Sequence, residues 1–188
     1  MVSSADLEKL PADPEAALVV GFVNTRDVEE GTDAIADPAG LAAWAAAHGG
    51  EAAGGEPGAE GHRDLLALRE SLRALLRANN GGEASDGDLE PLRRAIDRSR
   101  YRPTLGPDGR LTLDPVGDGS AALEARLLLA IERLQAQGDW PRLKACPADD
   151  CQWAFFDASR NRSRTWCSME ECGNRAKTRR YRRGKAAR

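Results

Sequence analysis

The sequence predicts an α+β protein in two parts. These are a mixed α/β N-terminal domain of several helices and short strands over residues 1–140, and a small four-cysteine module over residues 141–188. Three observations support this prediction. Apolar residues recur at helical spacing in several segments before residue 140, a Pro-Asp-Gly turn at 107–109 divides two partly alternating segments, and all four cysteines follow residue 140. At 188 residues the chain is long enough for one ordinary domain and a small module.

The first elements are assigned from apolar patterns and from helix-end signals. Leu18–Thr25 (LVVGFVNT) is a short apolar run rich in valine, and its length predicts a strand. A helix is expected from Pro38, with Asp37 as its N-cap and Gly49 as its end. The Gly-rich segment Gly49–Gly61 predicts a surface loop, and it lacks the Lys-Ser/Thr pair that would follow in a phosphate-binding P-loop.

More helices and a hairpin complete the N-terminal part. Leucines recur at helical spacing from about Asp64 to Ala78, and a shorter helix follows with Asp88 as its expected N-cap. Arg102–Pro115 carries turn residues between two alternating segments, which predicts an antiparallel hairpin. The longest helix is expected to begin at Ser120 and to end at Gly138.

The four cysteines, Cys146, Cys151, Cys167 and Cys172, have the spacing C-x4-C-x15-C-x4-C. Two close pairs allow two turns of the chain to offer two thiolates each to one tetrahedral ion, and four cysteines leave no open position for chemistry. The spacing therefore predicts one structural zinc ion. The alternatives are two disulfides, which would require an oxidising compartment, and incidental free thiols.

The N-terminus and the apolar runs favour the zinc interpretation. Residues 1–14 lack the basic and apolar parts of an export signal, and no apolar run is long enough to span a bilayer. We therefore expect a cytoplasmic protein that does not interact with membranes.

The segment between the cysteine pairs predicts a zinc-stapled hairpin. Gln152–Phe156 is typical of a strand, Asp157–Asn161 of a turn, and Ser163–Trp166 of a returning strand. The aromatic residues beside the cysteines are expected to shield the metal, and stacking of one or two of them on nucleic-acid bases is the alternative.

Charge is divided unevenly along the chain. Residues 142–188 hold 13 basic and 5 acidic residues, a net charge of +8, whereas residues 1–141 hold 14 basic and 25 acidic residues, a net charge of −11. Gly173–Arg188 contains eight Arg or Lys and no Asp or Glu, and it follows the last cysteine directly. A basic helix anchored by zinc predicts binding to nucleic acid.

The candidate contacts with nucleic acid lie in the loop between the cysteine pairs and in the basic helix. Arg175 and Arg179, nearest the metal, are expected to read bases, while Arg182 and Arg183 are expected to contact phosphates. The full set is Arg160, Arg162, Arg164, Asn174, Arg175, Lys177, Arg179, Arg180, Arg182 and Arg183.

Two motifs resemble known families. Cys172-Gly173-Asn174-Arg175, preceded by WAFFDASRNRSRTWCSMEEC and followed by RAKTRRYRRG, resembles the CGNR zinc finger over Leu143–Gly184. The segments FVNT (Phe22–Thr25), LAAW (Leu41–Trp44) and YRPTLGPDGRLTL (Tyr101–Leu113) resemble the ABATE domain that commonly precedes this finger. The resemblance implies a mixed α/β domain with a role in stress-responsive transcription regulation. Gly21 stands before FVNT where the family is expected to carry an acidic residue, a departure that bears on any ligand pocket there.

The leading hypothesis is a DNA-binding transcription regulator whose N-terminal domain senses a small molecule or a partner protein. A homodimer would extend the modest footprint of one short helix. The alternative is an RNA-binding or protein-interaction module, because small four-cysteine modules serve all three purposes. An enzyme is not expected, since the sequence offers no Ser-His-Asp set, no further group of metal ligands and no carboxylate pair that its pattern brings together.

Overall fold

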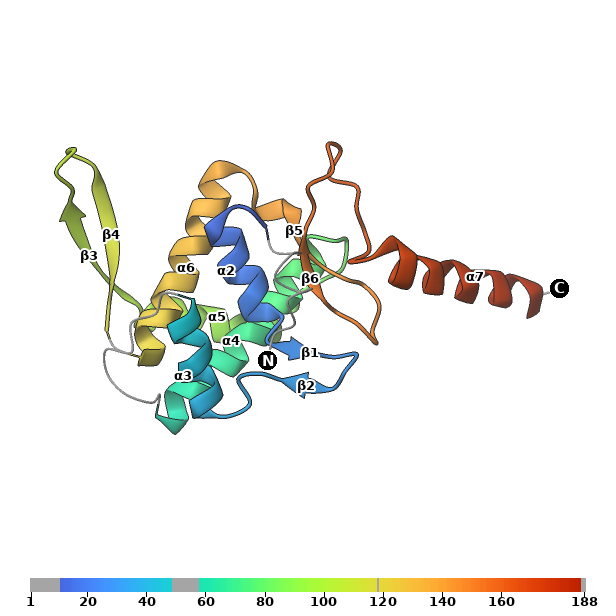
Figure 1. The fold of residues 1–188 in the computed structure, drawn as a ribbon, viewed down its shortest axis with the longest axis horizontal. Helices are drawn as coiled ribbons and strands as arrows, with labels where there is room; N and C mark the ends of the chain where they lie inside the picture. Colours follow the sequence, from blue (N-terminus) through green and yellow to red (C-terminus); the bar gives the residue numbers. More distant parts are fainter. Residues whose placement is uncertain (1–10, 49–57, 118, 187–188) are drawn as a thin grey trace.

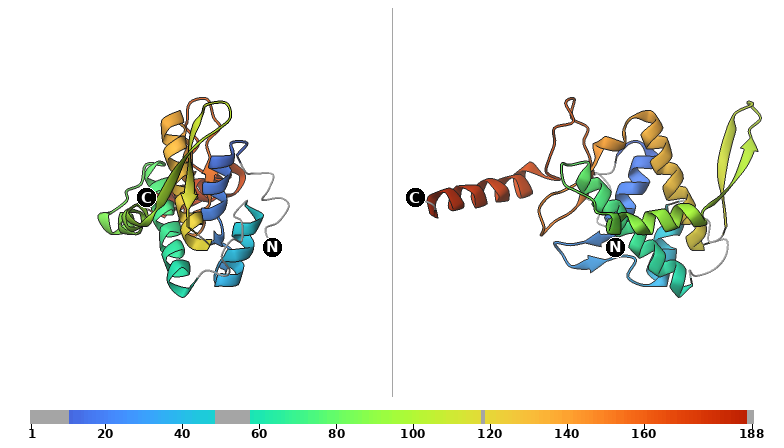
Figure 2. Two further views of the ribbon diagram at one scale, coloured as in Figure 1. Left: turned by 90° about the vertical axis from the view of Figure 1, so that its left-hand side faces the viewer. Right: turned by 180° about the vertical axis from the view of Figure 1, so that it is seen from behind.

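The computed structural model describes residues 11–48, 58–117 and 119–186. In chain order the elements are α2 (Pro14–Val23), β1 (Arg26–Asp27), β2 (Thr32–Asp33), α3 (Pro38–Ala47), α4 (Ala59–Ala78), α5 (Asp86–Arg98), β3 (Arg100–Leu105), β4 (Leu111–Val116), α6 (Gly119–Gln137), η1 (Trp140–Arg142), β5 (Leu143–Ala145), β6 (Ala154–Phe156), η2 (Met169–Gly173) and α7 (Asn174–Ala186). The mixture of helices and short antiparallel strand pairs confirms the predicted fold class. Figures 1 and 2 show a helical body with the β3–β4 hairpin projecting from one end and α7 from the other.

The predicted strand over Leu18–Thr25 is wrong, because this segment lies mostly in helix α2. Asp13 accepts the backbone N–H of Ala16 at 2.9 Å and Pro14 occupies the first turn, which together start the helix. The helix packs between α4, α6 and β6, and residues on nearly all of its sides are buried. A helix that is apolar all round shows no amphipathic period, so its length alone suggested a strand.

The other predicted helices are confirmed, with changes at their ends. Asp37 caps α3 by accepting the N–H of Gly40 at 2.7 Å, as expected. The cap of α5 is Ser85 rather than Asp88, because the two residues form a reciprocal capping box in which Asp88 accepts the N–H of Ser85 at 2.8 Å. No helix among the described residues is long and apolar enough to cross a membrane.

The expected loop over Gly49–Gly61 is only partly described. Residues 49–57, with the expected helix end at Gly49, lie outside the described residues, as do residues 1–10. The last three residues of the expected loop belong to α4, which begins at Ala59.

The predicted hairpin over Arg102–Pro115 is confirmed as β3–β4. Its register pairs Leu105 with Leu111 and Pro103 with Leu113, and Gly106 donates its N–H to Arg110 O across the turn at 2.8 Å. The hairpin contacts the body at its base, where β4 lies against α6. Its outer part is exposed, with Leu105 and Leu111 retaining 69% and 66% of their accessible surface.

The strand pair of the C-terminal module differs from the predicted one. Ala154–Phe156 pairs with Leu143–Ala145, and Ser163–Trp166 forms no strand. The segment after β6 is organised instead by Asp157, which accepts hydrogen bonds from Lys144 Nζ at 2.7 Å and from the N–H of Arg164 at 2.9 Å. Because this buried ion pair holds the segment in a loop, no returning strand forms.

The β5–β6 hairpin is part of the main hydrophobic core. Leu143, Ala145 and Ala154 are buried in the same cluster as the N-terminal helices, with Phe156 packed against it. Three asparagine side chains from the N-terminal region then bond the backbone of this module. Asn24 pairs with both the C=O and the N–H of Ala154 at 2.9 and 2.7 Å, Asn79 donates to the carbonyls of Trp140 and Leu143, and Asn80 donates to those of Ala145 and Thr165.

Candidate metal centre and cationic helix

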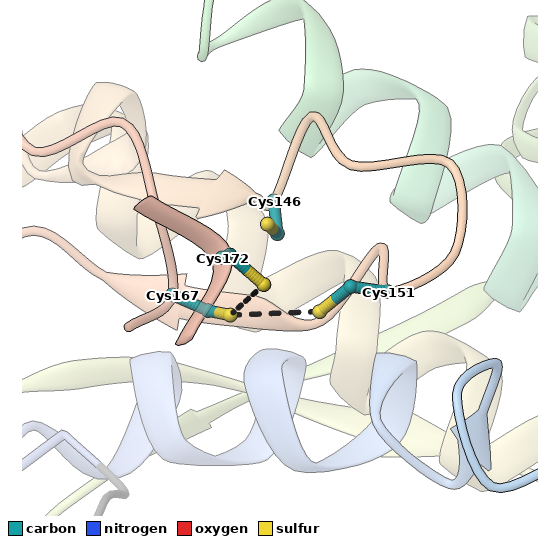
Figure 3. A group of neighbouring side chains, drawn as sticks. All are labelled: Cys146, Cys151, Cys167 and Cys172. Carbon is teal, nitrogen blue, oxygen red and sulfur yellow. Dashed lines mark hydrogen bonds between the residues drawn. The ribbon is translucent and has the colours of Figure 1, made fainter. Parts of the chain in front are cut away.

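The four cysteines come together from three parts of the module (Figure 3). Cys146 and Cys151 lie in the loop that joins β5 to β6, Cys167 lies in the long loop after β6, and Cys172 lies in the π-helical turn η2 that leads into α7. Their sulfur atoms all lie within 4.8 Å of one another. The Cys151–Cys167 and Cys167–Cys172 sulfur distances are 3.5 and 3.6 Å.

These distances fit one zinc ion and do not fit disulfides. Four sulfurs at about 2.3 Å from a tetrahedral zinc would lie about 3.8 Å apart. A disulfide would require about 2.05 Å, and all four cysteines are free. The predicted metal site is therefore present as a closed set of four sulfur donors that can hold one zinc ion.

The electrostatics of the cysteine cluster call for a cation. Hydrogen bonds from Cys151 and Cys167 lower the pKa of Cys146, whereas the hydrogen bond with Cys146 raises the pKa of Cys151 to about 12. The pKa of Cys167 is also raised, through its contacts with Cys146 and Cys151. These three sulfurs thus share one thiolate most readily, and a dication supplies the charge that stabilises further thiolates as ligands.

Aromatic and aliphatic side chains enclose the cysteine cluster. Trp153, Trp166 and Ala148 pack against it, as expected for residues that shield a metal. Gln152 precedes Trp153 with a φ of 56°, a left-handed conformation at the end of the turn that carries Cys151. The carbonyl of Gln152 accepts from Arg73 of α4 at 3.0 Å, which ties this turn to the N-terminal body.

Arg175, at the start of α7, connects the metal centre to the β1–β2 turn. Its Nη2 donates to Cys172 Sγ at 3.0 Å, and its guanidinium pairs with both carboxylate oxygens of Glu29. The Glu29 carboxylate and the Cys172 sulfur both raise the pKa of Arg175. Since zinc with four thiolates carries a net charge of −2, this guanidinium offsets part of that charge.

Arg179 is also engaged in an ion pair. Its Nη2 donates to Asp150 Oδ2 at 2.6 Å, and this hydrogen bond lowers the pKa of Asp150. The two arginines expected to read bases thus both contact acidic side chains of the same chain.

The other cationic candidates fall into two groups. In the loop, Arg164 lies over the Phe155 ring at 4.8 Å and donates to the carbonyls of Trp166 and Cys167, whereas Arg160 and Arg162 are exposed. On α7, four of the candidate cations are exposed and form no ion pair within the part of the chain that the structure describes, and the same is true of Lys185. The four candidates are Lys177, Arg180, Arg182 and Arg183. Asn174 has a local role, since its side chain donates to the carbonyl of Glu170 at 2.9 Å.

Two family models match the chain. The model described as "Putative stress-induced transcription regulator", named ABATE, matches residues 16–138, and the CGNR zinc finger model matches residues 142–185. The first match alone spans more than half of the chain. This chain belongs to the ABATE family. Neither the ABATE nor the CGNR description is that of an enzyme family, and a search of curated proteins gave no match.

Sequence reasoning missed two buried arginines of α4, one of which, Arg73, joins the ABATE region to the finger. Arg69 and Arg73 on α4 are only 3% exposed, with Arg69 paired to Asp33 at 2.7 Å and Arg73 bonded to backbone carbonyls on both sides of the junction. Their burial could have been predicted in part, because both arginines share a helix face with the buried leucines Leu65, Leu72 and Leu76. Burial of an arginine on such a face requires fixed acceptors, and these lie far away in the sequence.

Gly21, where the family is expected to carry an acidic residue, lies beside two aromatic rings. A Cβ at this position of the ABATE region would lie 3.8 Å from both His48 Nε2 and the Trp44 ring. These two rings stack with centroids 4.1 Å apart, and the His48 carbonyl accepts from Arg126 at 2.8 Å. A longer side chain at position 21 would therefore reach the Trp44–His48 pair.

Proposed function

We propose that this protein is a DNA-binding transcription regulator that contacts DNA through α7 and the adjoining zinc finger. One observation carries the proposal. Helix α7 projects from the body (Figure 1), begins two residues after a zinc-ligating cysteine, and presents exposed cations that form no ion pair within the described ranges. Such a helix attracts phosphates, and its anchored end limits the ways in which it can lie on a duplex.

The charge division supports the finger as the source of affinity. The ABATE-containing residues 1–141 carry a net charge of −11 and repel nucleic acid, while residues 142–188 carry +8. Sensing of a small molecule or partner protein by the ABATE region is part of the same proposal, as are assembly as a homodimer and a cytoplasmic location. The shared core of the β5–β6 hairpin gives such sensing a physical route to the finger.

The direct test is a selection of bound sequences from random pools of duplex DNA and of RNA, with the purified full-length protein at stated salt. We expect enrichment of particular duplex DNA sequences and an affinity that falls steeply as salt rises. The control is a full-length protein with Arg180→Glu and Arg183→Glu, which should keep its zinc and lose the enrichment. Preferential enrichment of RNA would favour the RNA-binding alternative, and no enrichment from either pool would overturn the proposal.

A further inference from the structure

The two sides of α7 border different cavities. On one side, a cavity of about 530 Å³ is lined by Glu29, Glu170 and Glu171 together with Thr178 and Arg182 of the helix. On the other side, a cavity of about 380 Å³ lies between the helix and the turn over residues 147–149, with Trp166 in its wall. Ala176, Arg180 and Arg183 line this second cavity. We call the 147–149 turn the knuckle and this cavity the knuckle-side cavity.

The charge available in each cavity differs. Arg175 and Arg179 border both, but their guanidinium groups are engaged with Glu29 and Asp150. In the Glu29-lined cavity, Glu170 and Glu171 are exposed and form no ion pair in the part of the chain that the structure describes. They outnumber the unpaired Arg182, so this side attracts phosphates less.

The knuckle-side cavity is cationic. Arg180 and Arg183 lie one turn apart and pair with no acid within the described ranges. Among the described residues, Asp149 is the one acidic residue in its lining, and its side chain is 94% exposed and lies 3.7 Å from Arg77. Two unpaired guanidinium groups thus line this cavity, and the negative charge of Asp149 is partly offset by Arg77.

The shape of this cavity depends on a small residue. Ala176 lies one helical turn after Cys172 and one turn before Arg180, and its side chain is a single methyl group. A longer side chain at this position would occupy the space between the helix and the 147–149 turn. The half-buried Trp166 and Cys172 line the cavity on the side of the metal centre.

We infer that the knuckle-side cavity is a binding site for a phosphodiester of the DNA backbone. The backbone passes over Ala176, and Arg180 and Arg183 donate hydrogen bonds to the phosphate oxygens, for which the planar guanidinium is well suited. The Glu29-lined side of α7 faces away from the duplex. This inference rests on the proposed function and adds the face of the helix that meets DNA.

Charge-matched alanine variants test the inference. Arg183→Ala and Arg180→Ala remove a cation from the knuckle side, whereas Arg182→Ala and Lys177→Ala remove one from elsewhere on the same helix. Binding of a fluorescein-labelled, mixed-sequence DNA duplex to the full-length zinc-loaded protein is followed by anisotropy at several salt concentrations. We expect each knuckle-side variant to weaken binding by about tenfold and to lower the salt slope by about one. Arg182 and Lys177 are also among the candidate contacts, and we expect their alanine variants to weaken binding by a smaller factor, below about threefold.

A second pair of variants changes shape without changing charge. Ala176→Leu fills the knuckle-side cavity and should weaken binding by about tenfold or more, whereas Thr178→Leu on the other side should have little effect. Zinc content and circular dichroism confirm that each variant is folded, and the alanine variants decide the question if Ala176→Leu loses its metal. Equal losses on both sides would overturn the inference and leave the proposed function standing. No DNA binding by the unmodified protein at low salt would overturn both.

Discussion

The two ends of the zinc module, the β5–β6 hairpin and helix α7, are held in opposite ways. The hairpin is buried in the main core and bonded by asparagine side chains of the ABATE region, while α7 is exposed along most of its length. The cysteines belong to both ends, because Cys146 and Cys151 lie in the hairpin loop and Cys172 leads into α7. Core packing therefore holds the hairpin, whereas α7 is held near its start, where Cys172 joins the cysteine cluster and Arg175 and Arg179 form ion pairs.

Loss of a metal ligand tests this comparison most strongly. Cys172→Ser should abolish tight zinc binding and release α7, with loss of DNA affinity, because the binding energy of a structural zinc is large. The β5–β6 amides should nevertheless stay protected in hydrogen–deuterium exchange, since the core holds them. If hairpin and helix lost protection together, the two ends would form one cooperative unit and the comparison would fail.

Two asparagine substitutions compare the ends directly. Asn24→Ala leaves both the N–H and the C=O of Ala154 without their partner and should lower the free energy of unfolding by about 2 kcal/mol. Asn174→Ala removes an exposed bond to the Glu170 carbonyl and should cost less than about 1 kcal/mol. Urea denaturation of the zinc-loaded proteins measures both values, and equal effects would contradict the distinction.

The free energy of unfolding should depend on pH through Asp157, which follows the buried β5–β6 hairpin. Burial raises the pKa of Asp157, but hydrogen bonds from Lys144, Ser159 and Arg164 outweigh burial and lower this pKa to about 2. A lowered folded-state pKa stabilises the fold fully above the ordinary value of 3.8, and this contribution of about 2 kcal/mol is lost as pH falls from there toward 2.

The free energies of unfolding of the unmodified protein and of Asp157→Asn are measured at each pH, and the difference between them is the readout. The difference is used because acid also releases zinc from both proteins. The difference should shrink as pH falls below about 4. Asp150→Asn, at the exposed Arg179 pair, serves as the control and should show a smaller change. A difference for Asp157→Asn that stayed constant down to pH 2 would refute the assignment.

The smallest expected effect concerns the contact between the ABATE region and the start of α7. Glu29→Gln removes the carboxylate charge that pairs with Arg175, so zinc transfer to a chromogenic chelator should become faster by about two- to fivefold. Glu30→Gln changes the neighbouring exposed residue and should leave the rate unchanged. Equal rates for both variants would show that the Glu29 contact does not act on the metal centre.

Local signals in the sequence predicted much of this fold. The Asp37–Pro38 helix start and the Pro107–Gly109 turn each act within a few residues, so their outcome depends little on the rest of the chain. The two cysteine pairs are local in the same way, although the pairs themselves meet across a longer loop. The helix at Pro14–Val23 was missed although Asp13–Pro14 repeats the signal at Asp37–Pro38. There the uniform apolar character of the run outweighed the cap signal in the prediction.

Other features depend on contacts that no local pattern encodes. Asn24 bonds Ala154 across 130 positions of the chain, and Arg175 meets Glu29 across 146. Sequence reasoning treated Arg175 as a free cation at the start of a basic helix. No residue near Arg175 in the sequence indicates that an exposed acid on a distant turn will pair with it. The metal site was predictable because cysteines in two closely spaced pairs are typical of a zinc centre.

The prolines of the β3–β4 hairpin have a consequence for the pairing of its edges with a strand from another molecule. Gly106 and Arg110 form a hydrogen-bonded pair, so by alternation Pro103 and Pro115 occupy the pairs whose backbone nitrogens point out of the hairpin, one on each outer edge. Neither edge therefore offers an unbroken row of donors to an incoming strand, although the hairpin projects with exposed leucines. The two prolines thus disfavour, at both edges of the projecting hairpin, the strand addition that begins amyloid-like aggregation.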